Sequence, residues 1–321
     1  MTNTATGNVT VEQVLEIAHR YRNWGRWGPD DQLGTVNYID AECRTHAASL
    51  VKTGKVISCA LPYDEFGPQN GGFGRVNPIH VMLQDGGDAA HGHQDNLPGL
   101  RYADDAVYMP LQSGTQWDAL AHIFYDGHMY NGYKQERVSS QGTDVNGIEN
   151  YADKIVTRGI FLDIPKYKGV DWLNPGDPIS GDDLAGCCEQ EGITPKRGDI
   201  VLVRTGAMAM VRATGSWGTY SAGDAPGLNL SAAAWLCENE VAGVATDTWG
   251  MEVRPNECAE IFQPLHVVLI VNAGMLVGEI FDFEALAADS AEDGVYAFMF
   301  VAPPLPFTGA VGSPLNPLAI K

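Results

Sequence analysis

Residues 113–122, Ser-Gly-Thr-Gln-Trp-Asp-Ala-Leu-Ala-His, are the most informative stretch of this 321-residue chain. Asp118 and His122 stand four residues apart in it, and far downstream His266 and Glu279 lie thirteen residues apart among apolar neighbours. If Asp118, His266 and Glu279 converged on one point, they would form an oxygen and nitrogen cage for a divalent metal. Because Asp-x-x-x-His pairs often arise by chance, the spacing alone is weak evidence for such a site.

The segment around this motif resembles the signature of a known family. Residues 112–122 are similar to the pattern His-x-Gly-Thr-His-x-Asp-x-Pro-x-His of the cyclase-family metal-dependent hydrolases, a group that includes bacterial kynurenine formamidase and isatin hydrolase. The Gly-Thr pair, Asp118 and His122 match the pattern, whereas Gln112 and Gln116 replace its two earlier histidines and a leucine replaces its proline. The departures therefore fall on metal-ligand positions of the family.

The resemblance continues through residues 26–31, 197–206 and 264–279, and so covers the chain from about residue 24 to 290. It implies an α/β protein with the mixed-sheet, swivelling β/α cyclase-family fold, built as a single domain with an N-terminal helical lead-in. The expected parts are the lead-in over residues 1–30, the catalytic domain over 31–300, and a Pro-rich C-terminal arm over 301–321 that packs on a neighbour.

The resemblance also implies roles for individual side chains. Asp118, His266 and Glu279 would hold a divalent metal, Zn²⁺ or Mn²⁺, and His122 would act as the catalytic acid and base. A carboxamide oxygen is a weaker zinc donor than imidazole, so we expect one tightly held metal, with Gln116 as a ligand or as an orienter of the metal water. Gln112 could equally serve as a structural hydrogen-bonding group.

Some of these residues have structural alternatives. His266 opens an apolar run, residues 267–271, which predicts a strand, and a lone histidine there is more often a hydrogen-bonded core residue. Glu279 ends the apolar region, and a buried unpaired carboxylate is costly, so a metal or an arginine such as Arg204 must neutralise it. Asp247, which follows another predicted strand, could line the pocket or cap a turn.

Aromatic side chains near the motif favour a flat, apolar substrate. The candidates for the substrate site are Trp27, Trp117, His80, Phe124 and Tyr130. Tryptophan is a core residue at least as often as a binding residue. His80 lies in a loop-rich region and could reach either the metal or the substrate.

These observations lead to a ranked set of functions. The favoured reaction is hydrolysis of a cyclic or formyl amide, in which an activated water attacks the carbonyl. A lactonase that opens a small unsaturated or aromatic-derived lactone is the first alternative. The second is a metal-free binding protein, suggested by the two glutamines. The chain has no Gly-x-Ser-x-Gly, His-Glu-x-x-His or phosphate-loop motif that would favour another chemistry.

The composition restricts the partners. Forty acidic and twenty basic residues give a net charge of −20, which disfavours nucleic acid and anionic membranes. We therefore expect a small-molecule substrate, no nucleic-acid or membrane partner, and assembly as a homodimer or homotetramer. The chain shows no recognisable targeting or spanning segment, and its six cysteines form no Cys-x-x-Cys pattern, so a cytoplasmic protein with free thiols is expected.

Helix and strand patterns alternate along the chain, which is typical of an α/β protein with a mixed sheet. Thr10 and Gln13 predict a capping box for a helix that begins at Val11. Residues 63–105 are dense in Gly, Asp and Asn and predict a long loop region that serves as a lid or a disordered insert. Strands are expected over residues 55–61, 159–164, 200–204, 241–246, 267–271 and 296–301, and helices over 180–190 and 231–240.

Overall fold

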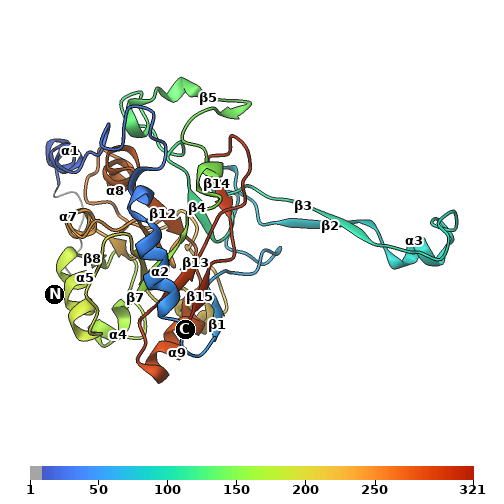
Figure 1. Ribbon diagram of the computed structural model, residues 1–321. Coiled ribbons are helices and arrows are strands. Elements are labelled where there is room, and N and C mark those ends of the chain that lie inside the picture. The colour runs from blue at the N-terminus through green and yellow to red at the C-terminus, as the bar shows by residue number, and fades with distance from the viewer. Residues whose placement is uncertain (1–8) are drawn as a thin grey trace.

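A nine-stranded sheet runs through the centre of the protein in the computed structural model, which describes residues 9–321 (Figure 1). Residues 1–8 of the expected N-terminal lead-in lie outside the described residues. In order along the sheet, the strands are β1 (Val56–Ser58), β15 (Leu318–Ile320), β13 (Ala297–Val301), β7 (Val156–Asp163), β9 (Ile200–Arg204), β11 (Gly243–Thr246), β12 (Leu276–Glu279), β4 (Gln116–Asp118) and β14 (Gly312–Pro314).

The middle of this sheet is parallel and its two sides are antiparallel. β7, β9, β11 and β12 run in one direction, while β13, β15 and β1 on one side and β4 and β14 on the other pair antiparallel. Parallel strands are covered on both faces, so they consist of nearly continuous apolar residues. All five residues of β9 are buried, as this rule requires. The mixed sheet confirms the predicted α/β class.

Helices cover the sheet on both faces (Figure 1). α2 packs on β7 and β13, α5 packs on α7, and α1 lies against the helical segment η6. The helices are α1 (Val11–Arg20), α2 (Ala41–Ser49), α3 (Gly86–Ala90), α4 (Ile164–Lys168), α5 (Gly181–Gln190), α6 (Ala207–Thr214), α7 (Leu230–Glu238), α8 (Pro264–His266), η6 (Val267–Ala273) and α9 (Glu284–Asp293). The short 3₁₀ helices are η1 (Gly34–Tyr38), η2 (Gly72–Gly74), η3 (Tyr130–Gly132), η4 (Gln135–Arg137) and η5 (Ile148–Tyr151). Three small two-stranded sheets pair β2 (Ile79–Gln84) with β3 (Asp104–Tyr108), β5 (Val138–Ser139) with β6 (Gly142–Thr143), and β8 (Pro178–Ile179) with β10 (Gly227–Leu228).

The helix starts expected from the sequence are present. At α1, Gln13 N donates to Thr10 Oγ1 at 3.3 Å and Thr10 N donates to Gln13 Oε1 at 2.9 Å, which is the predicted capping box. Ser180 caps α5 in the same way. Asn229 caps α7 by accepting from Ser231 N at 3.0 Å. These caps satisfy N–H groups that a helix leaves unpaired at its start.

The strand predicted over residues 267–271 was wrong, because this run forms η6, a π-helix that directly continues α8. The run is buried all round, and periodicity cannot distinguish a buried strand from a buried helix. Asn272 Nδ2 donates to the Val267 carbonyl at 2.8 Å within the turn. π-helical segments are rare and frequently lie at functional sites. Here the turn places His266 at the end of a short helix instead of at the start of a strand.

The N-terminal segment stabilises the end of η6. Trp24 Nε1 donates to the Val271 carbonyl at 2.8 Å, and Asn23 donates through its backbone and side chain to the carbonyls of Asn272 and Ala273. These bonds satisfy carbonyls that the helix leaves free at its C-terminal end. The described part of the lead-in is therefore built into the support of the candidate site.

Residues 301–321, expected as an arm packed on a neighbour, instead complete the chain's own sheet. β15 lies between β1 and β13, and β14 pairs with β4 at the far side. The high proline content did not reveal this, because β14 is an edge strand, where proline is tolerated.

Residues 63–105, expected as a loop region, contain regular structure. β2 and β3 form a long antiparallel hairpin that carries α3 near its tip and projects from the body (Figure 1). Within residues 9–321, no helix has the length and apolar character that crossing a membrane requires. All six cysteines lie in this described part of the chain, and each is a free thiol.

Candidate metal centre

Two carboxylates and one imidazole, each from a different element, meet beside the sheet. β4 and β12 are antiparallel neighbours, with Gln116 opposite Glu279 and Asp118 opposite Val277. Paired residues share a face and alternate residues along a strand share a face. The side chains of Gln116, Asp118 and Glu279 therefore lie on the same face of the sheet, and His266 approaches them from α8.

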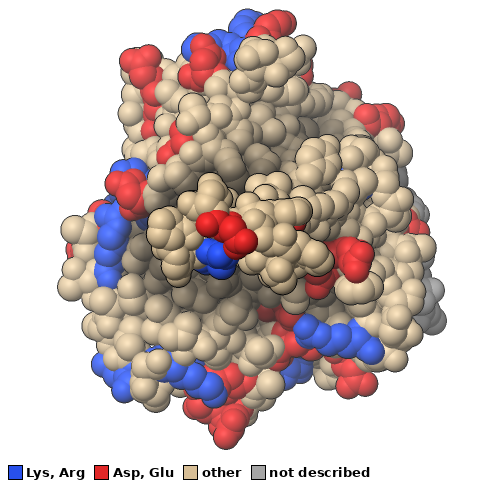
Figure 2. Space-filling model, turned by 90° about the vertical axis from the view of Figure 1, so that its right-hand side faces the viewer, with Lys and Arg blue, Asp and Glu red and all other residues tan. Residues whose placement is uncertain are grey.

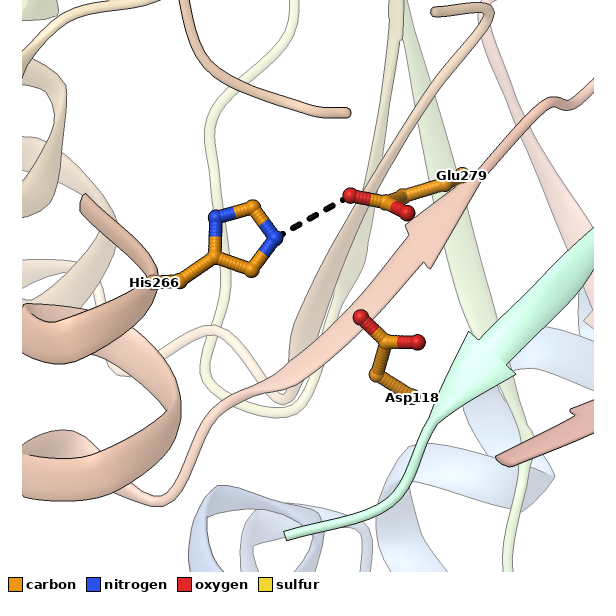
Figure 3. Close-up of side chains that lie close together, drawn as sticks. All are labelled: Asp118, His266 and Glu279. Atoms are coloured by element: carbon orange, nitrogen blue, oxygen red, sulfur yellow. Dashed lines mark hydrogen bonds and ion pairs between the residues drawn. The ribbon is translucent and has the colours of Figure 1, made fainter. Parts of the chain in front are cut away.

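The convergence predicted from the sequence is confirmed. One ligand atom from each of Asp118, His266 and Glu279 lies within 4.8 Å of the other two, and Figure 3 shows the three side chains turned toward a common point. All three are buried, with exposed fractions of 1%, 2% and 3%. Two carboxylates and an imidazole form a donor set suited to zinc or manganese.

Glu279 is held in place by three donors. Its Oε1 accepts from Met251 N at 3.1 Å and lies 3.1 Å from His266 Nε2, while its Oε2 accepts from Gln116 Nε2 at 3.1 Å. Arg204, considered as its partner, instead pairs with Asp163 and Glu284, each at 2.8 Å. Arg204 therefore does not neutralise Glu279, whose carboxylate is bound only within the cluster and by the Met251 backbone.

His266 is oriented by Glu252, a residue that the sequence analysis did not single out. Nδ1 of His266 donates to Glu252 Oε1 at 2.6 Å, and the backbone N–H groups of Leu265 and His266 also donate to this carboxylate. Such a carboxylate fixes the ring orientation and leaves Nε2 facing the cluster. Burial acts to lower the pKa of His266, but hydrogen bonds to Glu252 and Glu279 outweigh it and raise the pKa to about 10.

Asp118 provides the test of whether a cation fits this site. Its Oδ2 is fully buried and has no hydrogen-bond partner among residues 9–321. Burial raises the pKa of the Asp118 carboxyl; the nearby His122 opposes this rise and Glu279 adds to it. A buried carboxylate oxygen without a donor is unfavourable, and a cation between Asp118, His266 and Glu279 would satisfy it. The residues present therefore fit a divalent metal.

The two glutamines differ in position. Gln116 Nε2 lies 3.1 Å from Glu279 Oε2 and 3.4 Å from Asp118 Oδ1, and its Oε1 is buried without a partner in the described chain. This amide bridges the two carboxylates, which favours the orienting role over the ligand role. Gln112 Nε2 is also buried without a partner in residues 9–321, and it lies close to Gly312 in β14.

His122 lies at the side of the cluster that faces solvent. Its Nε2 is 3.8 Å from Asp118 Oδ1, and its side chain is 21% exposed. It lines the cavity in which His266 and Glu279 also appear. A histidine that touches both the cluster and the cavity is placed to exchange protons with a bound molecule.

The chain is similar in sequence to a defined family over more than half its length. Residues 68–253 match the family described as "Putative cyclase". A solved structure titled "Crystal structure of a novel cyclase" is 37% identical, with a TM-score of 0.86 over 95% of this chain and 99% of that chain. The chain belongs to the cyclase family.

More distant solved structures share the fold. Isatin hydrolase A from Labrenzia aggregata, solved with benzyl benzoate, is 18% identical with a TM-score of 0.58, over 85% of this chain and 94% of that chain. A "predicted metal-dependent hydrolase" from Bacillus stearothermophilus is 19% identical with a TM-score of 0.52, over 83% and 97%. A search of curated proteins finds no match.

A cavity of about 470 Å³ opens beside the cluster of this cyclase-family protein. Its walls combine the cluster with aromatic side chains, of which only Phe124 was predicted. Phe73 stacks on Phe262 with ring centroids 6.0 Å apart and lies 5.6 Å from the Trp249 ring. The lining residues are Phe73, Arg75, His122, Ile123, Phe124, Tyr125, Trp249, Glu260, Ile261, Phe262, Gln263, His266, Val267 and Glu279.

Four predicted substrate-site residues lie elsewhere. Trp117 follows the strand alternation onto the opposite face from Asp118, where it is fully buried and donates to the Ala302 carbonyl at 2.8 Å. Tyr130 is also core, with its hydroxyl donating to Asp31 at 2.9 Å. Trp27 packs edge-on against Tyr38, and His80 lies on the projecting hairpin, 2.8 Å from Asp105. Proximity to the motif in sequence did not predict proximity in space.

Asp247 caps a turn instead of lining the cavity. Its two carboxylate oxygens accept from Thr205 N at 2.7 Å and from Gly206 N at 2.9 Å. It is fully buried. The sequence left both roles open, and the structure gives Asp247 the structural one.

Proposed function

We propose that this cyclase-family protein is a hydrolase that binds one divalent metal, Zn²⁺ or Mn²⁺, and cleaves a C–N bond in a cyclic or formyl amide. The observation that carries the proposal is the buried group of Asp118, His266 and Glu279, in which one Asp118 oxygen is left without a donor among the described residues. The family and the names of the distant structures, isatin hydrolase and metal-dependent hydrolase, agree with it.

Asp118, His266 and Glu279 would hold the metal, and Glu252 would keep the His266 ring in position. A divalent ion supplies Lewis acidity for the substrate carbonyl and makes water more acidic. His122 takes a proton from the attacking water and then delivers it to the departing nitrogen, since one histidine can serve as base and acid in turn. The position of His122 between the cluster and the open cavity supports this role.

The walls of the cavity support a flat substrate that becomes anionic. Phe73, Trp249 and Phe262 provide aromatic surface on one side of the opening. Arg75 lines the same cavity, with its guanidinium 4.7 Å from the centre of the Trp249 ring. Amide hydrolysis produces a carboxylate, and a guanidinium is the side chain best suited to bind one. We therefore assign Arg75 to binding the carboxylate end of the opened product.

The experiment measures metal content by mass spectrometry and hydrolysis in a panel of formamides, cyclic imides, cyclic amides and lactones. We expect about one metal per chain, loss of turnover with chelator, recovery with Zn²⁺ or Mn²⁺, and the highest kcat/KM on a planar amide. Higher kcat/KM on lactones would replace the amide assignment with a lactonase. A protein without stoichiometric metal and without turnover would support the metal-free binding protein instead.

A further inference from the structure

Gln263 combines an unfavourable backbone conformation with a place in the wall of the cavity. Its φ and ψ angles are 53° and 63°, in the left-handed region that residues other than glycine rarely adopt. Pro264 follows directly, and a residue before proline is further biased toward extended conformations. Glycine would adopt these angles freely, so the glutamine side chain is present at the expense of backbone strain. Strain of this kind is concentrated at sites that bind ligands.

Hydrogen bonds of the backbone hold Gln263 in this conformation. Gln263 N donates to Asn256 Oδ1 at 3.1 Å, and the Gln263 carbonyl accepts from His266 N at 3.1 Å. The second bond closes the turn of α8, which presents His266 to the metal centre. The position of Gln263 is therefore fixed relative to His266, because both residues belong to one hydrogen-bonded turn.

The carboxamide of Gln263 lies beside the metal centre. A Cβ atom on Gly250 would stand 2.7 Å from Gln263 Nε2 and 3.8 Å from Glu279 Oε1, so both atoms lie within 4 Å of one point. Gln263 is half-buried and lines the same cavity as His122 and Glu279. Its hydrogen bonds within residues 9–321 are those of its backbone, which leaves both ends of the carboxamide available to a ligand.

The surroundings of Gln263 favour a neutral, planar ligand. Phe262 precedes it, and the Phe262 ring stacks on Phe73 with the centroids 6.0 Å apart. A flat ring packed on this aromatic surface has its polar edge within reach of the adjoining carboxamide. Phe73 and Arg75, which also line the cavity, shortly precede β2 of the projecting hairpin. The body surface around the hairpin is hollowed and carries few charged side chains (Figure 2).

A carboxamide can distinguish classes of carbonyl compound that a metal treats alike. It carries an N–H donor and a carbonyl acceptor side by side. The secondary amide inside a small ring presents the matching pair on one edge, because ring closure holds its N–H and C=O groups cis. A lactone has no N–H group, and an N-alkylated cyclic amide keeps only the acceptor. A site that pairs with the N–H group therefore rejects both of these analogues.

We propose that Gln263 determines specificity by binding the edge of a ring amide, with Nε2 donating to the substrate carbonyl and Oε1 accepting from the ring N–H. Resting on the proposed hydrolase function, this role narrows the substrate class to cyclic amides and imides with a free N–H. It accounts for the backbone strain at Gln263, which directs the side chain into the cavity. It also accounts for glycine at position 250, where a side chain would displace the carboxamide.

The test compares three probes of similar shape. Phthalimide has the ring N–H, N-methylphthalimide lacks it, and the lactone phthalide lacks it without the added bulk of a methyl group. Binding is measured by quenching of tryptophan fluorescence directly after mixing, and hydrolysis by kcat/KM. The wild type should bind and hydrolyse phthalimide better than either analogue by about 10-fold or more.

Two glutamine-to-methionine variants isolate the hydrogen bonds. Gln263→Met keeps the length of the side chain but has no amide, so the preference for phthalimide should fall close to one while the metal content stays unchanged. The matched control Gln190→Met changes an exposed residue at the end of α5 and should keep the wild-type preference.

Gln263→Gly separates this role from a structural one. Glycine relieves the strain at this φ angle, so the variant should unfold at or above the wild-type temperature and still lose the preference. A wild type that binds phthalimide no better than its analogues, or a Gln263→Met protein that keeps the preference, would overturn the proposal. A wild type that prefers phthalimide in binding but hydrolyses none of the probes would remove the hydrolase function and leave the binding role of Gln263 in place.

Discussion

The candidate metal centre and the projecting hairpin of β2 and β3 both leave groups unmatched within residues 9–321, but in different ways. At the centre, everything that positions Asp118, His266 and Glu279 comes from the body, and what remains unmatched in the described chain is a buried carboxylate oxygen. On the hairpin, the hydrogen bonds between β2 and β3 are made, and what remains unmatched is exposed apolar surface. A buried unmatched polar atom calls for an ion, whereas exposed apolar surface calls for another protein.

Because the two regions share no residues, a substitution in one of them should leave the other unchanged. The largest effect is expected from Asp118→Asn and Glu279→Gln. Each removes a charge from the cluster with little change in shape, so metal affinity should fall by more than about 100-fold and turnover should be lost. Isothermal titration with Zn²⁺ or Mn²⁺ gives the affinity, and activity is measured in parallel.

The control for this first prediction is Glu252→Gln, since Glu252 binds His266 Nδ1 but does not belong to the three-residue cluster. It should lose about 10- to 100-fold in metal affinity, less than either ligand variant. Full metal affinity in Asp118→Asn would remove Asp118 from the ligand set.

His122 should affect rate without affecting metal. Because it lies 3.8 Å from Asp118 on the cavity side and outside the three-residue cluster, His122→Ala should keep its metal and fold and lose roughly 10²–10⁴-fold in kcat. Metal content and single-turnover rates are the measurements. If the alanine variant loses its metal, His122 is a ligand and the proton is moved by another group.

The two glutamines set the number of metals at the centre. Imidazole is the stronger zinc donor, so Gln112→His/Gln116→His should raise the metal content from about one toward two per chain. Metal analysis of both proteins after dialysis tests this. A wild type that already binds two metals would show that the glutamines, or other residues, are adequate ligands.

The last of these predictions concerns Asp247, a buried carboxylate that the body itself satisfies. Burial raises the pKa of Asp247 to about 6, although bonds from Thr205 oppose the rise. The folded state therefore binds this proton more tightly than the unfolded state, and the contribution to stability falls as pH rises from about 4 to about 6. Relative to Asp247→Asn, the wild type should lose up to about 3 kcal/mol of unfolding free energy over this window.

Urea unfolding of both proteins at several pH values measures this difference. Parallel pH dependences for wild type and Asp247→Asn would contradict the raised pKa. Both proteins are compared at the same metal loading, so that the contribution of the candidate metal centre to the free energy of unfolding is the same.

The sequence revealed the three residues of the candidate metal centre better than their surroundings. Asp118, His266 and Glu279 were identified through the family motif, and the buried strands through their apolar runs. The residues that complete the site, Glu252 and Arg75, carry no local pattern, because each contributes only through tertiary contacts. A periodic pattern could have revealed the β2–β3 hairpin, since Ile79 and Val81 alternate with other side chains in β2. The turn-forming residues around them favoured a loop instead.

Two further features could not be predicted from the sequence, for another reason. They are the helical conformation of residues 267–273 and the sheet pairing of residues 312–320. Both depend on partners distant in the chain: Trp24 and Asn23 bind the end of η6, and β14 and β15 fill places in a sheet that begins more than 200 residues earlier. Tertiary context overrides local propensity in such segments.

Anomalous X-ray diffraction from crystals grown with Mn²⁺ tests the metal centre most directly. The account predicts one strong peak within bonding distance of a carboxylate oxygen of Asp118, a carboxylate oxygen of Glu279 and Nε2 of His266. A stoichiometric Mn²⁺ bound elsewhere, or no peak between these three residues, would contradict it.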